Sequence, residues 1–181
     1  MLEISVKDSI PVRGEYDVIV AGGGLAGVAA AVSARRMGKK VLIIEKTVAL
    51  GGLATNGIVN LFVPMCNGRG VQIIKGMAEE FLRLSIKYGY DTIPEDWLNG
   101  EPGEGTNHRY VTRFSPGVFS LALTELIINE GVDILYDTVV TQPVMEGKHC
   151  EGLIVENKSG REYYKAKIVV DTTGDADILY R

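Results

Sequence analysis

The 181-residue sequence has only two cysteines, two histidines and one tryptophan. Cys66 and Cys150 form no Cys-x-x-Cys pair, and His108 and His149 are isolated, so the ligand spacing of a metal site is missing. Two cysteines without such a pair favour reduced thiols, as in a cytoplasmic protein, over a disulfide. We therefore expect no metal site and no disulfide framework.

Positive charge and long apolar runs are also scarce. Lysine and arginine together number 19 against 23 aspartates and glutamates, which gives a net charge of −4. This balance excludes the strongly basic surface by which proteins hold nucleic acid or an anionic membrane. No apolar run approaches the roughly 20 residues that span a bilayer. The first eight residues also lack the charged-then-apolar pattern of a secretory signal, so we expect a cytoplasmic protein.

Enough apolar material is present for one core. Hydrophobic residues make up 46% of the chain and charged residues 23%, which is typical of a globular domain. A chain of this length buries one good core. We therefore expect a single domain over residues 1–181.

A glycine turn between an apolar strand and an alanine-rich helix is the most informative stretch. In Asp17-Val-Ile-Val-Ala-Gly-Gly-Gly-Leu-Ala-Gly27, the glycines Gly22, Gly24 and Gly27 have the spacing GxGxxG. Gly22 allows the sharp turn, Gly24 lets the backbone approach a ligand, and Gly27 lets the helix lie close to the sheet. Backbone N–H groups and the positive helix end would then face a pyrophosphate. The alternative is a glycine turn without a ligand in an unrelated α/β domain.

A carboxylate ends the second strand. Glu45 follows Val41-Leu-Ile-Ile44, about 20 residues beyond the glycines, where it can accept hydrogen bonds from both ribose hydroxyls. The same carboxylate would repel a 2′-phosphate, which argues against NADP. Strand, turn, helix and carboxylate together form the context that a dinucleotide-binding motif requires.

Periodicity and turn residues predict the remaining elements. Residues 1–15 are expected to form an N-terminal arm, 46–115 an insertion with one helix, and 138–166 a three-stranded antiparallel β-meander. The expected parallel strands are 16–21, 41–45, 132–136 and 166–171, and the expected helices are 25–37, 71–88 and 117–130. The predicted fold class is α/β, a Rossmann-like parallel sheet with an antiparallel β-meander insertion. NAD domains of dehydrogenases normally have helical crossovers in place of the meander, so this order is that of FAD domains.

The sequence resembles the FAD-dependent oxidoreductases with a Rossmann domain of the glutathione reductase type, and among them the bacterial FAD dependent oxidoreductase family. Three separated motifs carry the resemblance in the right order. They are Tyr16-Asp-Val-Ile-Val20 with the glycines and Glu45-Lys46, then Leu50-Gly-Gly-Leu-Ala-Thr-Asn-Gly57, then Asp171-Thr-Thr-Gly-Asp-Ala-Asp177. The resemblance covers nearly the whole chain and implies a flavoprotein whose cofactor is FAD.

The resemblance also implies which positions would touch the phosphates of FAD. Leu25 and Ala26 would present backbone N–H groups to the pyrophosphate. Gly174 and Asp175, in the third motif, would close over the pyrophosphate and the ribitol. Both ends of the chain would thus contribute to one phosphate site.

The adenosine half of FAD would be held from the second strand and the start of the meander. The resemblance implies that Glu45 holds the adenosine ribose, with Lys46 beside it. It also implies that the backbone of Val140 pairs with the adenine edge, with Val139 as the alternative one position earlier.

The flavin half would lie along the second motif. By the resemblance, Gly52, Ala54 and Thr55 would run alongside the ribityl chain and the isoalloxazine ring. Members with covalent flavin carry a histidine beside this loop, whereas this sequence has Ala54, Thr55 and Asn56 there. We therefore expect FAD to bind non-covalently.

The sequence identifies no catalytic acid or base. Candidates near the flavin ring are Thr55, Asn56, Asn60, Cys66 and Asn67. Cys66 could be a redox or nucleophilic thiol, but a small buried residue in an apolar run is the simpler interpretation. His108 and Arg109, after the long irregular segment 89–107, could bind a substrate carboxylate and donate a proton. The alternative is an exposed pair without a role.

We expect an oxidoreductase that transfers a hydride or electrons between an unidentified small-molecule substrate and FAD. The resemblance implies that family members run on into a substrate domain, and we expect that domain to be absent from residues 1–181. The alternative is therefore a catalytically incomplete fragment or subunit that binds FAD or ADP and needs a partner chain. An NAD-dependent dehydrogenase is a third hypothesis, which the meander and the third motif disfavour. Without a substrate domain, an exposed apolar patch should remain for a second copy or a partner subunit to cover.

Overall fold

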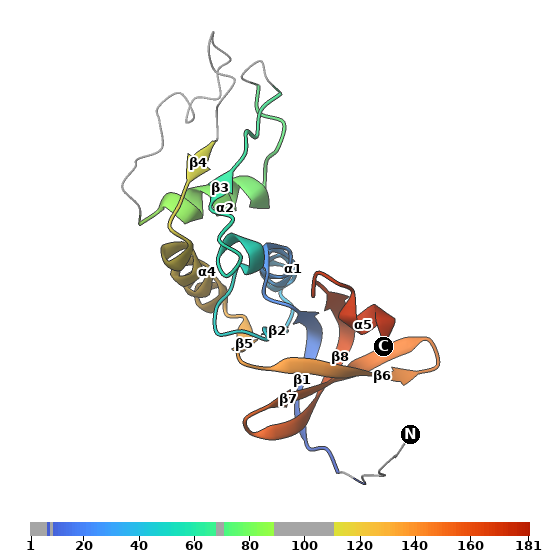
Figure 1. The fold of residues 1–181 in the computed structure, drawn as a ribbon. Helices are drawn as coiled ribbons and strands as arrows, with labels where there is room; N and C mark the ends of the chain where they lie inside the picture. Colours follow the sequence, from blue (N-terminus) through green and yellow to red (C-terminus); the bar gives the residue numbers. More distant parts are fainter. Residues whose placement is uncertain (1–6, 8, 68–70, 89–110) are drawn as a thin grey trace.

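The computed structural model describes residues 7, 9–67, 71–88 and 111–181, which fold around one six-stranded sheet (Figure 1). The strand order is β5-β2-β1-β8-β7-β6, in which the first four strands are parallel and β7 and β6 are antiparallel. The strands are β1 (Val12–Ala21), β2 (Val41–Ile44), β5 (Asp133–Leu135), β6 (Val139–Glu146), β7 (His149–Asn157) and β8 (Gly160–Asp171). The predicted fold class, a Rossmann-like sheet with antiparallel strands, is confirmed.

Two helices cover one face of the parallel strands. They are α1 (Leu25–Arg36) and α4 (Pro116–Glu130), within one residue of the predicted bounds. The residue after α4, Gly131, adopts the left-handed conformation (φ 74°) that ends many helices. The helices and this face enclose the larger core, which includes fully buried Val20, Ile43 and Phe119.

The opposite face of the sheet is covered by the antiparallel strands and a short C-terminal helix, α5 (Asp177–Tyr180). Ile19 and Ile44 of the parallel strands pack there with Leu153 of β7 and Ile178 of α5. Both faces of the short parallel strands are therefore buried, which explains their continuous apolar sequence.

The insertion between β2 and α4 contains more than the one predicted helix. Within the described residues it holds a 3₁₀ turn, η1 (Gly52–Ala54), the helix α2 (Met77–Ile86), and an antiparallel pair of short strands, β3 (Leu61–Phe62) and β4 (Thr112–Arg113). The helix expected over 71–88 begins only at Met77, because Gly76 has a φ of 69° that no α-helix accommodates.

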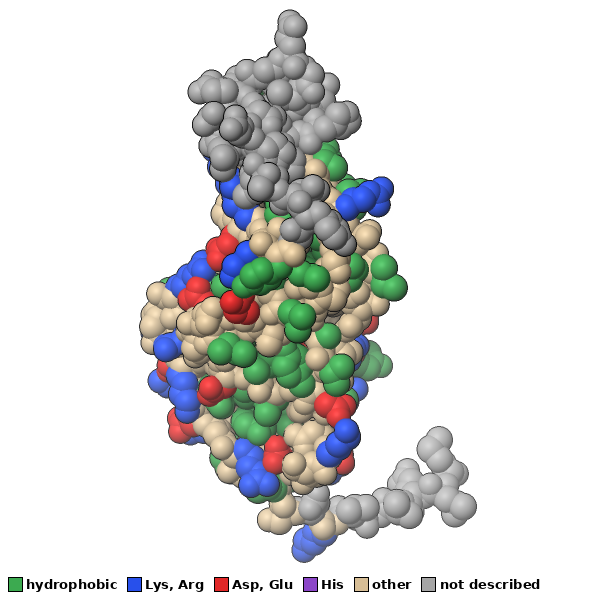
Figure 2. All heavy atoms as spheres, turned by 90° about the vertical axis from the view of Figure 1, so that its left-hand side faces the viewer, with side chains coloured by type: hydrophobic (Ala, Val, Ile, Leu, Met, Phe, Trp, Pro, Cys, Tyr) green, Lys and Arg blue, Asp and Glu red, His purple; other side chains and the backbone are tan. Residues whose placement is uncertain are grey.

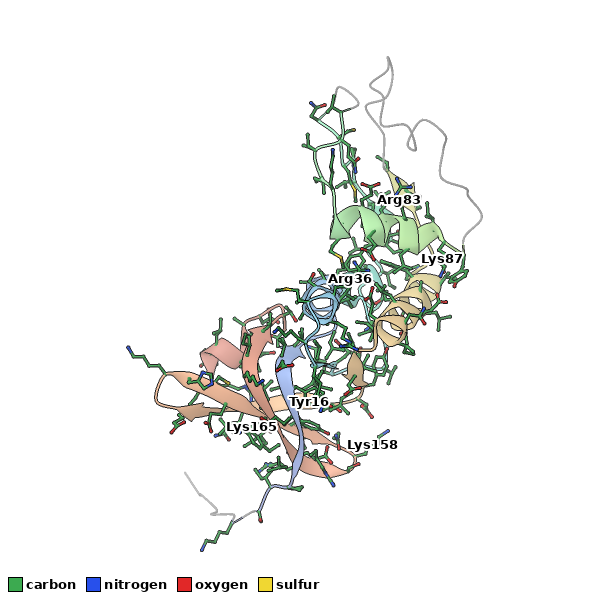
Figure 3. All side chains as sticks on the ribbon, turned by 180° about the vertical axis from the view of Figure 1, so that it is seen from behind. Tyr16, Arg36, Arg83, Lys87, Lys158 and Lys165 are labelled. Carbon is green, nitrogen blue, oxygen red and sulfur yellow. The ribbon has the colours of Figure 1, made fainter. Side chains whose placement is uncertain are left out.

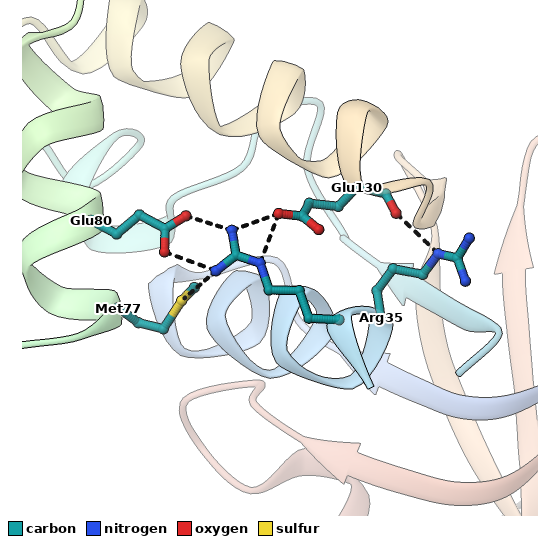
Figure 4. A network of polar contacts seen from close by, with 5 residues as sticks. Arg35, Met77, Glu80 and Glu130 are labelled. Atoms are coloured by element: carbon teal, nitrogen blue, oxygen red, sulfur yellow. Dashed lines mark hydrogen bonds and ion pairs between the residues drawn. The ribbon is translucent and has the colours of Figure 1, made fainter. Parts of the chain in front are cut away.

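An arginine at the end of α1 joins three helices (Figure 4). Arg36 donates two hydrogen bonds to Glu80 of α2, at 2.9 and 2.7 Å, and its Nε donates to Glu130 of α4 at 2.8 Å. The hydrogen bond from Arg36 lowers the pKa of the Glu80 carboxyl. Seen from behind, Arg36 lies where α1 meets the insertion, whereas Tyr16 and Lys165 lie on the sheet (Figure 3). The network therefore fastens α2 of the insertion to α1 and α4.

The structure corrects two predicted strand boundaries. The third strand of the meander and the separate strand 166–171 are one continuous strand, β8, because Lys165 pairs with β7 on one side and with β1 on the other. The predicted arm 1–15 is also too long, since β1 begins at Val12, which pairs with Tyr163 of β8. Long-range pairing decides both boundaries.

Exposed apolar side chains gather on the α4 side of the molecule (Figure 2). On α4, Leu121 and Ile128 are 72% and 62% exposed although the helix is apolar around much of its circumference. A helix of that composition is usually covered on several sides. Among the described residues, no helix has the length and apolar character needed to cross a bilayer.

Candidate functional site

A cavity of about 830 Å³ opens at the carboxyl ends of β1, β2 and β8. Its volume lies within the range of about 300–1,000 Å³ that is typical of small-molecule sites. β1 stands between β2 and β8, so the cavity lies where the strand order changes direction, and α/β sheets bind ligands at that point. The wall comes from five segments, within residues 22–26, 44–47, 51–57, 138–140 and 172–177.

The glycine turn forms the floor of the cavity, and its three motif glycines differ in what surrounds them. Gly22 has a φ of 105°, and a Cβ there would lie 2.5 Å from the carbonyl oxygen of Thr172. A Cβ on Gly27 would overlap the carbonyl oxygen of Gly22. At Gly24, by contrast, no heavy atom of the described residues lies within 4 Å of that position. Gly22 and Gly27 are thus needed for packing, and Gly24 leaves its space to the cavity.

The N-terminus of α1 points into this space. Leu25 and Ala26 line the cavity, and the first intrahelical bond runs from the N–H of Val28 to the carbonyl of Gly24. The N–H groups of the first helical turn have no acceptor within a helix. No side chain in the described part of the chain caps this helix, and its first turn carries no acidic residue. Unpaired N–H groups and the positive helix end therefore face the cavity, which suits an anionic ligand.

A second glycine segment supports the turn from behind. The N–H of Gly51 donates to the carbonyl of Gly23 at 2.8 Å, and a Cβ on Gly52 would lie 3.1 Å from the Cα of Gly24. Gly23 itself is enclosed, because a Cβ there would lie 2.6 Å from a methyl carbon of Leu50. The two loops lie backbone against backbone, which explains the glycines in both.

Glu45 lines the cavity at the end of β2 and is only 6% exposed. Its Oε2 accepts a hydrogen bond from the N–H of Gly23 at 2.7 Å, and its Oε1 accepts one from the N–H of Thr47 at 2.8 Å. A carboxylate has about four acceptor positions, so roughly two remain for a ligand. Besides facing the ligand space, Glu45 therefore ties the glycine turn to the loop after β2.

Backbone bonds bring the start of β6 beside the end of β2. The N–H of Thr138 donates to the carbonyl of Glu45 at 3.2 Å, and the N–H of Asp137 donates to the carbonyl of Thr47 at 3.0 Å. Asp137 has a φ of 50°, so the chain turns sharply before Val140 reaches the wall. β6 is an edge strand, so one side of its backbone has no neighbouring strand in the described sheet.

The loop 172–177 closes the opposite side of the cavity. The N–H of Thr172 donates to the carbonyl of Ala21 at 2.9 Å, and its hydroxyl lies 2.9 Å from the carbonyl oxygen of Gly22. Gly174 and Asp175 follow on the wall. The loop is thereby seated directly on the glycine turn.

The family model for FAD dependent oxidoreductase matches residues 17–181. The chain belongs to the FAD dependent oxidoreductase family. Its cofactor is FAD, as in that family, and the sequence-based prediction of both is confirmed.

Curated relatives differ in activity. An NADH:fumarate oxidoreductase of Klebsiella pneumoniae is 28% identical over 188 residues, covering 88% of this chain and 20% of the relative. A tRNA uridine 5-carboxymethylaminomethyl modification enzyme MnmG of Lactobacillus johnsonii is 33% identical over 179 residues, covering 90% of this chain and 24% of that enzyme. The chain therefore spans about a quarter or less of the length of these relatives.

Solved structures share the fold. THI4 of Thermovibrio ammonificans has a TM-score of 0.61 at 20% identity, covering 92% of this chain and 60% of that protein. The myxobacterial FAD-dependent halogenase CndH has a TM-score of 0.63 at 18% identity, covering 91% of this chain and 38% of the halogenase.

The cavity fits FAD in its donors, its acceptors and the open space at Gly24. Unpaired N–H groups at Leu25 and Ala26 suit a pyrophosphate, and the bare face of Gly24 leaves room for it. At the end of β2, the free acceptor positions of Glu45 suit ribose hydroxyls. The family's cofactor and the geometry of this chain therefore agree.

Eleven of the thirteen predicted site residues lie on the cavity wall: Gly22, Gly24, Leu25, Ala26, Glu45, Lys46, Gly52, Ala54, Val140, Gly174 and Asp175. The other two lie behind it. Gly27 packs against the glycine turn. Thr55 is 6% exposed, and its hydroxyl donates to the carbonyl of Leu50 at 2.6 Å.

Sequence reasoning missed several wall residues, among them Thr47, Gly51, Leu53, Gly57, Thr138, Thr172, Thr173 and Asp177. Most are sequence neighbours of predicted residues, so the motif pattern itself could have indicated them. Thr138 had a further signal, because it directly precedes β6, the strand that carries Val140.

The candidate catalytic groups do not converge on the cavity. Asn56 lines it, whereas Asn60, Cys66 and Asn67 are absent from its wall. Cys66 is buried, at 8% exposed. His108, Arg109 and the irregular segment 89–107 lie outside the described residues. Among the residues that are described, no group of three or more His, Cys, Asp or Glu side chains could hold a metal ion.

Proposed function

We propose that the cavity binds FAD non-covalently and that the protein is an oxidoreductase exchanging a hydride or electrons with a small-molecule substrate. One observation carries the proposal. The unpaired N–H groups at the start of α1 and the carboxylate of Glu45 line the same cavity. Bound FAD supplies the redox chemistry through its isoalloxazine ring. The residues of this chain bind it, orient it and limit access of water.

Each wall segment has a proposed part in holding FAD. Leu25 and Ala26 would donate to the pyrophosphate, and Gly174 with Asp175 would close over it. Glu45 would accept from the adenosine ribose. Lys46, on the same wall, would lie beside Glu45 at the ribose.

The remaining segments would hold the two ring systems. The backbone of Val140, exposed along the edge of β6, would pair with adenine. Gly52 and Ala54 of η1 would run along the ribityl chain and the flavin. Thr55 would act from behind, because its hydroxyl bond to Leu50 fixes the shape of η1.

Gly24→Ala tests the site with little risk to the fold. Gly24 has φ −64° and ψ 176°, which an alanine adopts without strain, and its added methyl meets no described protein atom. The methyl would stand where the pyrophosphate approaches. We expect FAD affinity to fall at least tenfold, or about 1.4 kcal/mol, with the melting temperature without FAD unchanged.

Gly117→Ala is the matched control. Gly117 lies in the first turn of α4, has open space at its Cβ, and does not line the cavity. FAD binding should equal that of the wild type in this variant. Wild-type protein that takes up no FAD, or a Gly24→Ala variant that binds FAD normally, would refute the proposal. Protection against heat by NAD but not by FAD would favour a dehydrogenase instead.

A second function, an FAD-binding subunit that needs a partner chain, has one observation in its favour. Leu53 lines the cavity yet is 76% exposed, so the wall is open to solvent there. We propose that a substrate domain, a second copy or a partner subunit covers this opening. Bound FAD that accepts electrons from dithionite but from none of a panel of small-molecule substrates would support the subunit function over the complete enzyme.

A further inference from the structure

The last residue of β8 gathers four hydrogen bonds. Oδ1 of Asp171 accepts from the N–H of Thr173 at 3.0 Å and from its hydroxyl at 2.7 Å. Oδ2 accepts from the N–H of Ile178 at 3.0 Å and from the N–H of Leu179 at 3.2 Å. Asp171 is not on the cavity wall, but its carboxylate holds both ends of the loop 172–177, which lines the cavity.

That loop adopts conformations that need support. Gly174 has a φ of 93°, and Ala176 has a φ of 57°, a left-handed conformation that costs an alanine roughly 1 kcal/mol or more. Such conformations persist when surrounding contacts hold them in place. Beyond the loop, Ile178 is buried in the second core, so its N–H is a fixed anchor for the carboxylate.

We propose that Asp171 is a positioning residue for FAD binding: its carboxylate clamps the two ends of the loop 172–177 and so holds Gly174 and Asp175 against the ligand. This proposal rests on the proposed function, because Asp171 can position residues for FAD only if FAD binds in the cavity.

A carboxylate is the side chain that this arrangement requires. Burial opposes ionisation of Asp171, but the hydrogen bonds from Thr173, Leu179 and Ile178 outweigh it, and the pKa of the carboxyl lies below its usual value. An asparagine has one acceptor oxygen and would turn its NH₂ group toward one pair of donors. The near-isosteric change Asp171→Asn therefore opens the clamp at one end.

Asp17→Asn is a matched control on β1, the strand that pairs with β8. Asp17 accepts from the N–H of Lys40 at 2.9 Å and from the Nζ of Lys167 at 2.7 Å, and the hydrogen bond from Lys167 lowers the pKa of its carboxyl. The substitution Asp17→Asn removes the same charge as Asp171→Asn. Asp17 is not on the cavity wall, and it lies beside the start of β2.

The test measures the FAD dissociation constant at 25 °C and the visible circular dichroism of FAD at saturation. We expect Asp171→Asn to weaken FAD binding roughly 10- to 100-fold and to change the dichroism of the bound flavin, with Asp17→Asn like the wild type. A change in dichroism at saturation reports a moved wall, which lower stability alone would not produce. Asp171→Asn binding within twofold of the wild type, or equal losses in both variants, would overturn the proposal.

A second pair of variants serves if Asp171→Asn does not fold. Leu179→Pro removes the N–H that donates to Asp171, in the single turn of α5. Leu179→Ala keeps that N–H. Both changes replace a side chain that is 82% exposed. We expect the proline variant alone to weaken FAD binding, by about threefold or more. Equal affinities in this pair would also overturn the clamp. Wild-type protein without FAD binding would instead refute the proposed function, so the two failures are distinguishable.

Discussion

The carboxylate of Glu45 should stabilise the protein even in the absence of FAD. Its two oxygens accept from the N–H groups of Gly23 and Thr47 at 2.7 and 2.8 Å, at a side chain that is 6% exposed. A glutamine keeps one acceptor oxygen, so one of these N–H groups would face an NH₂ group. A buried donor left without an acceptor costs about 1–3 kcal/mol.

The expected effect of Glu45→Gln is therefore a loss of about 2 kcal/mol in the free energy of unfolding of the FAD-free protein. For a chain of this size, that corresponds to a fall of about 4–8 °C in melting temperature. Thermal melts followed by circular dichroism, after removal of FAD, measure it directly.

Glu15→Gln is a control on the same sheet. Glu15 is exposed on β1, and its carboxylate lies 3.9 Å from the Nζ of Lys165, so its loss should cost less than about 0.5 kcal/mol. If Glu45→Gln melted like the wild type without FAD but lost FAD affinity, the carboxylate would act on the ligand alone. The structural role argued from the two short bonds would then be wrong.

Three further outcomes follow from the fold. Gly27→Ala should destabilise the protein by about 3 kcal/mol or more in denaturant unfolding, because its Cβ would overlap the carbonyl oxygen of Gly22; a normal midpoint would contradict the close packing of α1. Arg36→Met should cost only about 1 kcal/mol, since the side chain is partly exposed, and the difference should shrink in high salt; a loss insensitive to salt would point to packing instead. Burial raises the pKa of Tyr16 and Tyr164 to about 12, together with a hydrogen bond to Asp133 for Tyr16 and a hydrogen bond to Glu162 for Tyr164. Because these pKa values exceed those of unfolded tyrosine, the stability they contribute is present below about pH 10 and falls as the pH rises toward 12; phenolate absorbance that appears fully by pH 10 would refute it.

The nucleotide-binding half of the fold could be predicted because its signals are local. The apolar strand, the glycine spacing and the carboxylate after Ile44 lie within 30 residues, and each is interpretable from its neighbours in sequence. The cavity accordingly contains Gly24 and Glu45 where the motif requires them.

What could not be predicted depends on partners far away in sequence. Nothing in residues 160–171 shows that one strand would pair with both β7 and β1, because both partners lie elsewhere in the chain. Thr55 was predicted to run alongside the ribityl chain and the flavin, but it lies behind the wall, where its hydroxyl donates to the carbonyl of Leu50. Asp171 was part of a quoted motif, yet its four donors come together only when α5 folds back.

The double membership of β8 limits how this domain can be altered. Its twelve residues extend over roughly 36 Å, and Tyr163 to Lys165 pair with a parallel neighbour and an antiparallel neighbour at once. Exchanging the antiparallel hairpin for a helical crossover would therefore remove hydrogen bonds from a central strand that also leads into the loop 172–177 on the cavity wall. Replacing or deleting that hairpin should make the unfolding of the whole domain less cooperative. Changes to the insertion between β2 and α4 should leave the central strands paired.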